Sequence, residues 1–249
     1  MAHEASKRLV PGAKTAVLLV HGICGSSEHF RSLLPLEERI PVDWSYHNLV
    51  LDGHCAEVSD FGRSSMKKWQ KQVDDAFDEL AGSHQSLILV GHSMGTLLSI
   101  RQALRHPQKI KTLFLLAVPV KVFVRPRAIP NLLRVALGMT RGNDPVLRSM
   151  CCACGIRHTK RLWKYIPWIP RMVELLHFCG QTAKQLGDLR VSCIALQSAK
   201  DEMVSARAGR LLRDSGRVEV IDLPNSTHFY YEPQDQQTIL DLFDAVCKE

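Results

Sequence analysis

The stretch Gly91-His92-Ser93-Met94-Gly95 constrains this chain more than any other, because of what stands on either side of it. Residues 87–90 form an apolar run typical of a buried strand, and residues 97–105 have the pattern of a helix that ends before Pro107. Strand, G-x-S-x-G turn and helix together make up a nucleophile elbow, in which the serine backbone is strained and bulky residues at positions 91 and 95 would collide with their neighbours. A surface turn that merely contains a serine is the alternative, and the flanking elements disfavour it. We predict that Ser93 projects above a sheet, at a helix start whose N–H groups face a developing oxyanion.

Apolar runs recur along the rest of the chain at intervals that suit alternating strands and helices. We expect strands over residues 15–20, 46–51, 110–118, 191–197 and 217–223, helices over 65–81 and 235–247, and a further helix over 28–38. Alternation of this kind requires a mostly parallel sheet with helices on both faces, so the expected class is α/β. With 249 residues, 45% of them hydrophobic and 23% charged, the chain is long enough for one large soluble domain.

Residues 120–185 break this alternation. They show no strand signal, and they contain five prolines, at positions 126, 130, 145, 167 and 170. From Lys121 to Lys184 there are twelve Lys or Arg and two acidic residues, a net charge of +10 in a chain whose total is +7. We predict a mainly helical cap over residues 120–185, inserted into a core of residues 1–119 and 186–249.

The predicted cap contains both apolar and basic side chains. Its larger apolar residues could form a channel for an acyl chain: Leu132, Leu133, Leu137, Trp163, Ile166, Trp168, Ile169 and Leu175. Its basic residues leave two interpretations open, contact with an anionic membrane surface or an acidic acyl carrier, or a solvated outer face. No nucleic-acid-binding motif accompanies the charge, so nucleic acid is not an expected partner.

The expected compartment follows from what the sequence lacks. No apolar run approaches the roughly 18 residues that cross a bilayer, and the first fifteen residues have no signal-peptide core. We expect a cytoplasmic protein, peripheral to a membrane if the cap binds one. Cys151, Cys154 and His158 have a spacing that superficially suits zinc, but no distant ligand pair accompanies them. We therefore expect packed thiols and no metal or organic cofactor.

Two further side chains have the chemistry that a serine nucleophile requires. Ser93 needs a base near neutral pH, for which imidazole is suited, and the base needs a carboxylate to fix its tautomer. Asp201 follows the expected strand 191–197, and His228 follows the expected strand 217–223. Both therefore lie at carboxyl ends of strands, where open parallel sheets place their sites. Glu202 is the local alternative to Asp201.

An oxyanion needs two hydrogen-bond donors, and the sequence offers two backbone candidates. The loop after the first expected strand contains Gly22 and Gly25, and in serine hydrolases this loop carries one oxyanion donor. We assign that donor to the N–H of Ile23 and the other to the N–H of Met94, which follows Ser93 directly.

With these residues in place, the chain resembles the α/β-hydrolase family over residues 15–246. The resemblance is strongest to the group that contains bacterial carboxylesterases and monoacylglycerol lipases. It is carried by five motifs, VLLVHGICGSSEHF (17–30), LDGHC (51–55), LILVGHSMGT (87–96), SAKDEMV (198–204) and NSTHFYYE (225–232). The resemblance implies nucleophile Ser93, acid Asp201, base His228, and oxyanion donors Ile23 and Met94.

The resemblance also implies an activity, the hydrolysis of acyl esters such as monoacylglycerols through an acyl-enzyme. A thioesterase, a carbon–carbon bond hydrolase of the same fold and a catalytically silent ligand-binding relative are the alternatives. Two departures from the group's pattern, Ser198-Ala199 and Cys55 where glycines are frequent, remove no reacting group. The basic cap is less typical of the group, so the identity of the substrate stays open.

Overall fold

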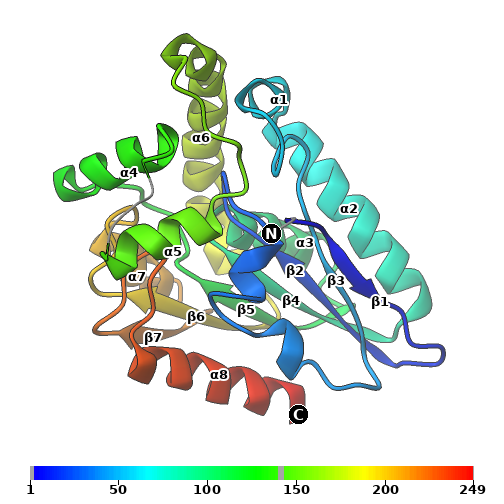
Figure 1. Ribbon diagram of the computed structural model, residues 1–249. Helices are drawn as coiled ribbons and strands as arrows, with labels where there is room; N and C mark the ends of the chain where they lie inside the picture. Colours follow the sequence, from blue (N-terminus) through cyan, green and yellow to red (C-terminus); the bar gives the residue numbers. More distant parts are fainter. Residues whose placement is uncertain (1–2, 140–142, 249) are drawn as a thin grey trace.

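A seven-stranded sheet runs through the computed structural model, which describes residues 3–139 and 143–248 (Figure 1). The strand order across the sheet is β1-β3-β2-β4-β5-β6-β7. All neighbouring strands are parallel except β1, which runs antiparallel to β3. The strands are β1 (Ser6–Arg8), β2 (Thr15–Val20), β3 (Ser45–Asn48), β4 (Ser86–His92), β5 (Ile110–Leu116), β6 (Ser192–Ser198) and β7 (Glu219–Leu223). The predicted α/β class and mostly parallel sheet are confirmed.

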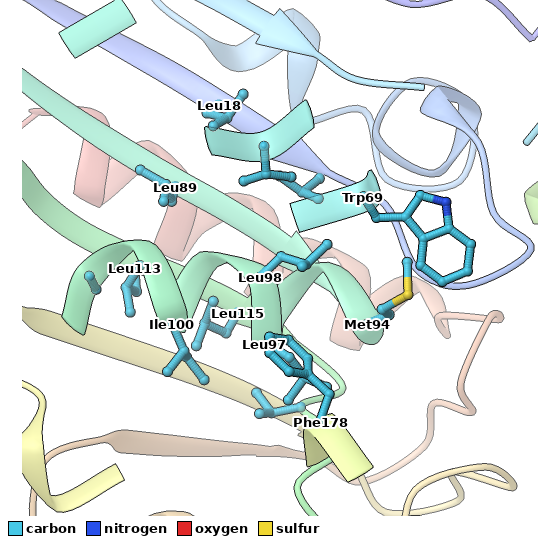
Figure 2. Close-up of a cluster of buried hydrophobic side chains, with 14 of the residues drawn as sticks. Leu18, Trp69, Leu89, Met94, Leu97, Leu98, Ile100, Leu113, Leu115 and Phe178 are labelled. Atoms are coloured by element: carbon cyan, nitrogen blue, oxygen red, sulfur yellow. The ribbon is translucent and has the colours of Figure 1, made fainter. Parts of the chain in front are cut away.

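Helices cover both faces of the sheet because its central strands are apolar on both sides. One face packs against α2 (Met66–Ser83), α3 (Met94–Arg105), α6 (Ile169–Gln185) and α7 (Ala206–Asp214). Figure 2 shows part of this layer, in which leucines of the strands meet Leu97, Leu98 and Ile100 of α3, with Phe178 of α6 beside them. The helix α3 is therefore held between the sheet and α6, which fixes the position of its first turn.

The opposite face packs against the last helix, α8 (Pro233–Lys248). Val17 and Val90 alternate with the residues of the first face, as the period of two in a strand requires, and they join a second cluster with Ile239 and Phe243. The rings of Phe114 and Phe243 lie 5.4 Å apart, with their planes at 66°. The central strands are thus buried on both sides, which explains their continuous apolar runs.

The expected helix over 28–38 is wrong. Two short 3₁₀ helices occupy this region, η1 (Ser27–Phe30) and η2 (Glu37–Arg39), and Pro35 between them has no N–H to continue a helical ladder. Ser26, which precedes η1, makes no capping bond and instead donates its Oγ–H to the carbonyl of Ala153. The strand β1, the helix α1 (Val58–Arg63) and the helix α7 were not expected from the sequence.

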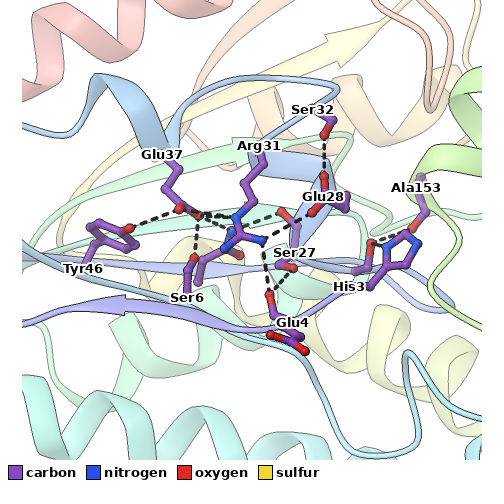
Figure 3. A network of polar contacts seen from close by, with 12 residues as sticks. His3, Glu4, Ser6, Ser27, Glu28, Arg31, Ser32, Glu37, Tyr46 and Ala153 are labelled. Atoms are coloured by element: carbon purple, nitrogen blue, oxygen red, sulfur yellow. Dashed lines mark hydrogen bonds and ion pairs between the residues drawn. The ribbon is translucent and has the colours of Figure 1, made fainter. Parts of the chain in front are cut away.

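A network of polar side chains ties this region to the edge of the sheet (Figure 3). Glu37 accepts hydrogen bonds from Ser6 of β1 (2.7 Å) and from Tyr46 and Asn48 of β3 (3.0 and 2.7 Å). Arg31 pairs with Glu37 and also with Glu28. Burial alone would raise the pKa of Glu37, but the three hydrogen bonds outweigh it and lower the pKa. The loop after β2 is therefore anchored by a charged carboxylate.

The segment between β5 and β6 is helical in the part of the chain that the structure describes. It contains η3 (Pro126–Ala128), α4 (Ile129–Ala136), α5 (Pro145–Ala153), η4 (Leu162–Trp168) and α6, before η5 (Leu186–Asp188) leads into β6. Leu175, Phe178 and Cys179 in the second half of α6 belong to the same core cluster as α3. The division into a core and a cap over 120–185 stays a prediction, since part of α6 packs into the main core. Arg141, one of the twelve basic residues, lies outside the described residues.

Candidate active site

Ser93 stands between β4 and α3 in a conformation that L-amino acids rarely adopt. Its φ is 50° and its ψ is −121°, a strain of about 1–3 kcal/mol that the surrounding structure must maintain. The Ser93 N–H donates to the carbonyl of Leu116 on β5, at 2.9 Å. A Cβ at Gly91 would lie 2.7 Å from Thr96 Cα, and one at Gly95 would overlap the carbonyl of Val20. Gly91 is thus required by the close approach of α3, and Gly95 by the close approach of β2.

Asp201 and His228 are brought together by the loops after β6 and β7. The Nδ1–H of His228 donates to Asp201 Oδ2 at 2.8 Å, and both side chains are buried. The other carboxylate oxygen of Asp201 accepts the N–H groups of Met203 and Val204, each at 2.7 Å. Burial alone would lower the pKa of His228, but the adjacent charge of Asp201 and this hydrogen bond raise it above its ordinary value. The pair therefore fixes the tautomer in which Nε2 carries no proton.

The backbone of His228 is held as well as its ring. Its N–H donates to Glu202 Oε2 and its carbonyl accepts from His92 Nε2, both at 3.1 Å. Burial raises the pKa of Glu202. Glu202, the alternative to Asp201, thus contacts the main chain of His228, whereas Asp201 contacts the imidazole.

Ser93 and His228 line the same cavity, of about 540 Å³, beneath the helical segment between β5 and β6. Among the contacts of the described residues, no hydrogen bond joins Ser93 Oγ to the His228 ring. Hydrogen bonds of this kind are often long in unliganded enzymes and tighten when substrate binds. The structure therefore places the three sequence-predicted residues at one site, with Asp201 and His228 in contact.

The loop carrying Ile23 passes close to the serine. A Cβ at Gly22 would lie 2.9 Å from Ser93 Cβ, so the loop can approach only because this residue is glycine. The next residue, Cys24, has a φ of 58° and donates its N–H to His54 Nε2 at 3.1 Å. Within residues 3–139 and 143–248, the Ile23 N–H has no hydrogen-bond partner. The Ile23 and Met94 N–H groups thus belong to two segments that adjoin Ser93.

The cavity is lined almost entirely by apolar side chains. Four of the residues expected to form an acyl channel line it: Leu132, Leu133, Trp168 and Leu175. The expectation is wrong for Leu137, Trp163, Ile166 and Ile169, which are not among its lining residues; the Trp163 side chain is 65% exposed. Several other lining residues were not predicted from the sequence: Val122, Val124, Ile129, Tyr165, Met172 and Met203.

A column of buried rings behind the site was not predicted. The rings of His29 and His92 stack with centroids 3.7 Å apart, and Tyr231 Oη lies 3.3 Å from His29 Nε2. Burial, assisted by the neighbouring His228, lowers the pKa of His29 to about 3, and burial likewise lowers the pKa of His92. Both rings are therefore neutral at pH 7. The position of His92 directly before Ser93 is the one sequence signal that could have indicated that His92 lies at the site.

The cysteines form no metal centre in the part of the chain that the structure describes. No group of three or more His, Cys, Asp or Glu side chains there is arranged to hold an ion. Cys151 lies on α5 and Cys154 directly follows it, and burial raises the pKa of both thiols. The zinc-like spacing of these residues with His158 therefore does not correspond to an assembled set of ligands.

The chain is similar to known proteins over most of its length. The profile of a family described as alpha/beta hydrolase fold matches residues 15–139. A thermostable monoacylglycerol lipase from Bacillus sp. (strain H-257) is 25% identical over 230 residues, covering 90% of this chain and 87% of the relative. A solved chain from work on LipS and LipT, two metagenome-derived lipolytic enzymes, matches with a TM-score of 0.73 at 20% identity, covering 99% and 98% of the two chains. The monoacylglycerol lipase of Paleococcus ferrophilus matches with a TM-score of 0.66 at 16% identity, covering 97% and 98%.

Proposed function

Since the chain belongs to the alpha/beta hydrolase fold family, we propose that it hydrolyses carboxylic esters with Ser93 as nucleophile, His228 as base and Asp201 as acid. The observation that carries the proposal is the Asp201–His228 pair, 2.8 Å between Oδ2 and Nδ1, in the cavity that Ser93 also lines. The names of the lipolytic relatives point to the same class of reaction.

The proposed mechanism uses groups of this chain alone. His228 Nε2 takes the proton of Ser93 Oγ as that oxygen attacks the ester carbonyl. The N–H groups of Ile23 and Met94 stabilise the negative charge that develops on the carbonyl oxygen. The protonated His228, stabilised by Asp201, then gives its proton to the leaving alcohol, and an acyl-enzyme remains on Ser93. A water molecule, activated by His228 in the same way, releases the acid.

The cavity supports an acyl ester as the substrate. Its apolar lining can bury a hydrocarbon chain, and four of its polar lining residues, His29, His92, Ser93 and His228, lie next to one another. A volume of about 540 Å³ is in the range of small-molecule sites. A monoacylglycerol, the substrate that the Bacillus relative is named for, has this combination of an apolar chain and a small polar head.

The surface above the cavity supports peripheral contact with an anionic membrane. Six exposed apolar side chains follow one another at steps of one to four residues along η4 and α6: Leu162, Trp163, Ile166, Ile169, Val173 and Leu176. We name them the apolar ridge. Arg161 directly precedes this stretch and Lys164 lies within it, and α6 extends away from the sheet (Figure 1). Basic and apolar side chains mixed in this way suit a lipid interface. No helix among the described residues is long and apolar enough to cross a bilayer.

The activity of the site is tested by removing its nucleophile. Ser93→Ala should abolish hydrolysis of p-nitrophenyl esters of short and long acyl chains while leaving the thermal unfolding transition in place. A fluorophosphonate probe should label the natural protein at Ser93, as located by peptide mass spectrometry. Ser59→Ala, a matched change on α1, should keep both labelling and turnover. Labelling at another residue, or turnover by the Ser93 variant, would refute the assignment.

A further inference from the structure

Beside the site, two segments that are far apart in the sequence form hydrogen bonds with each other. These paired segments lie between two cavities. Phe123 N–H donates to the Met203 carbonyl at 3.1 Å, and Arg125 N–H donates to the Glu202 carbonyl at 2.8 Å. Val122 and Val204 form an antiparallel bridge within this pairing. Side chains of an extended segment alternate between its two faces. Val122 and Val124 accordingly line the cavity of Ser93, whereas Phe123 and Arg125 line a separate cavity.

This second cavity, which we name the arginine pocket, has a volume of about 500 Å³. Four of its eight lining residues are arginines and none is acidic: Phe123, Arg125, Pro126, Arg127, Ser205, Ala206, Arg207 and Arg210. Glu202 and Asp144 line a different cavity, which they share with Arg127. The positive charge of the arginine pocket is thus not balanced from within its own lining.

The four arginines of the pocket differ from half of the other arginines in the described chain. Seven arginines form ion pairs with carboxylates: Arg31, Arg39, Arg63, Arg105, Arg157, Arg171 and Arg213. None of the four in the pocket pairs with a carboxylate of residues 3–139 or 143–248. Arg127 donates to the carbonyl of Lys200 at 2.9 Å, a neutral acceptor. Four like charges around one hollow repel one another, and a bound anion would relieve that repulsion.

We propose that the arginine pocket binds a phosphorylated small molecule that carries at least two negative charges. The planar guanidinium fork matches phosphate oxygens bidentately, and four such groups favour a diphosphate over a single carboxylate. Ser205 caps the first turn of α7, so the positive end of that helix adds to the same field. The Phe123 side chain, 60% exposed, and Pro126 offer an apolar surface for the rest of the ligand. This site goes beyond the proposed hydrolysis, because it uses none of the groups that hydrolysis requires.

The test is a calorimetric titration of the full chain with inorganic pyrophosphate at constant ionic strength. We expect saturable binding of one pyrophosphate per chain, and a weakening of about tenfold or more in Arg207→Ala and in Arg210→Ala. Arg210→Lys, which keeps the charge but loses the fork, should fall between the natural protein and Arg210→Ala. Arg217→Ala removes an equal charge from an exposed arginine outside the pocket and should bind pyrophosphate like the natural protein.

Further measurements distinguish a soluble phosphate ligand from a lipid phosphate, and a loss of binding from a loss of folding. Vesicles of phosphatidic acid should not compete with pyrophosphate for the pocket; binding to those vesicles through Arg207 and Arg210 without binding of pyrophosphate would overturn the proposal. So would equal weakening by Arg217→Ala, or the absence of saturation at millimolar pyrophosphate. Each variant is first assayed with a short soluble ester, whose turnover should stay within about twofold of the natural rate. Loss of that turnover in Ser93→Ala leaves the pyrophosphate result unaffected, so the two proposals fail separately.

Discussion

His228 is held by residues that stand next to its two proposed partners in the sequence. His92 precedes Ser93 and bonds the His228 carbonyl, and Glu202 follows Asp201 and bonds the His228 N–H. The two turns that carry Ser93 and Asp201 therefore also fix the main chain of His228. Because the rings of His29 and His92 are stacked and neutral, they can support this loop without adding positive charge beside the imidazole.

The two neighbouring carboxylates should respond differently to neutralisation. Asp201→Asn should lower kcat on the order of 10⁴-fold, because the amide cannot hold the His228 tautomer that the base requires. Glu202→Gln keeps an oxygen that can accept the His228 N–H, so kcat should fall by less than about tenfold. Steady-state kinetics on one soluble ester measure both effects. The reverse order of the two losses would assign the acid role to Glu202.

The pH profile gives an independent measurement at the same residues. A base must be neutral to act, and the pKa of His228 is raised above its ordinary 6.5, so kcat/KM should fall on acidification with a midpoint above pH 6.5. The charge of Glu202 contributes to this raised pKa, after that of Asp201. Glu202→Gln should therefore move the midpoint to lower pH. An unchanged midpoint would mean that Glu202 has only a structural role.

The helices and strands that can be predicted from the sequence are those whose own residues carry the hydrophobic pattern of a helix or a strand. The strands β2, β4 and β5 are continuous apolar runs, and α2, α3 and α8 carry apolar residues at helical spacing. The strand β1 has the sequence Ser-Lys-Arg and exists through its pairing with β3. The helix α7 buries Ala208, Gly209 and Leu212 alone, too narrow a stripe to be recognised.

The same distinction applies to the candidate site. Positions at the carboxyl ends of strands could be predicted for Ser93, Asp201 and His228, because parallel strands bring those ends to one edge. The cavity lining and the stack of His29 on His92 arise from segments that meet only after folding. Trp163 is an example: its large apolar side chain suits a channel, but its position on η4 leaves it exposed.

The network around Glu37 should make stability depend on acid pH. The folded pKa of Glu37 is lowered from 4.5, so its contribution is present above about pH 4.5 and is lost as the pH falls through the folded pKa. Glu37→Gln should lower the free energy of unfolding by about 1–2 kcal/mol at pH 7 and reduce the acid dependence. Urea unfolding at several pH values measures both. Glu38→Gln, on the exposed neighbour, is the control, and equal acid dependence in the natural protein and Glu37→Gln would contradict the prediction.

Over the whole molecule, charge and exposed apolar surface are both concentrated in residues 120–185. The segment carries +10 by sequence, while the total is +7, so the rest of the chain is slightly acidic. The apolar ridge lies in the same segment. A molecule polarised in this way would orient toward an anionic surface with the ridge leading. Lipid would then meet the segment that covers the cavity of Ser93.

This orientation predicts how binding to vesicles depends on salt and on the ridge. Each cation near an anionic bilayer contributes about 1 kcal/mol, and salt screens it beyond roughly 10 Å at 0.1 M, so co-sedimentation with anionic vesicles should exceed that with neutral ones at low salt and weaken at high salt. The double variant Trp163→Ala, Ile166→Ala should bind less at every salt concentration, because burial of apolar surface is not screened. Val42→Ala, at a side chain 85% exposed outside residues 120–185, is the matched control. Turnover of a soluble short-chain ester should stay unchanged in all three proteins, since none of these residues lines the cavity. Equal binding to anionic and neutral vesicles, or equal binding by the double variant and the natural protein, would leave the ridge and its charge as a solvated surface.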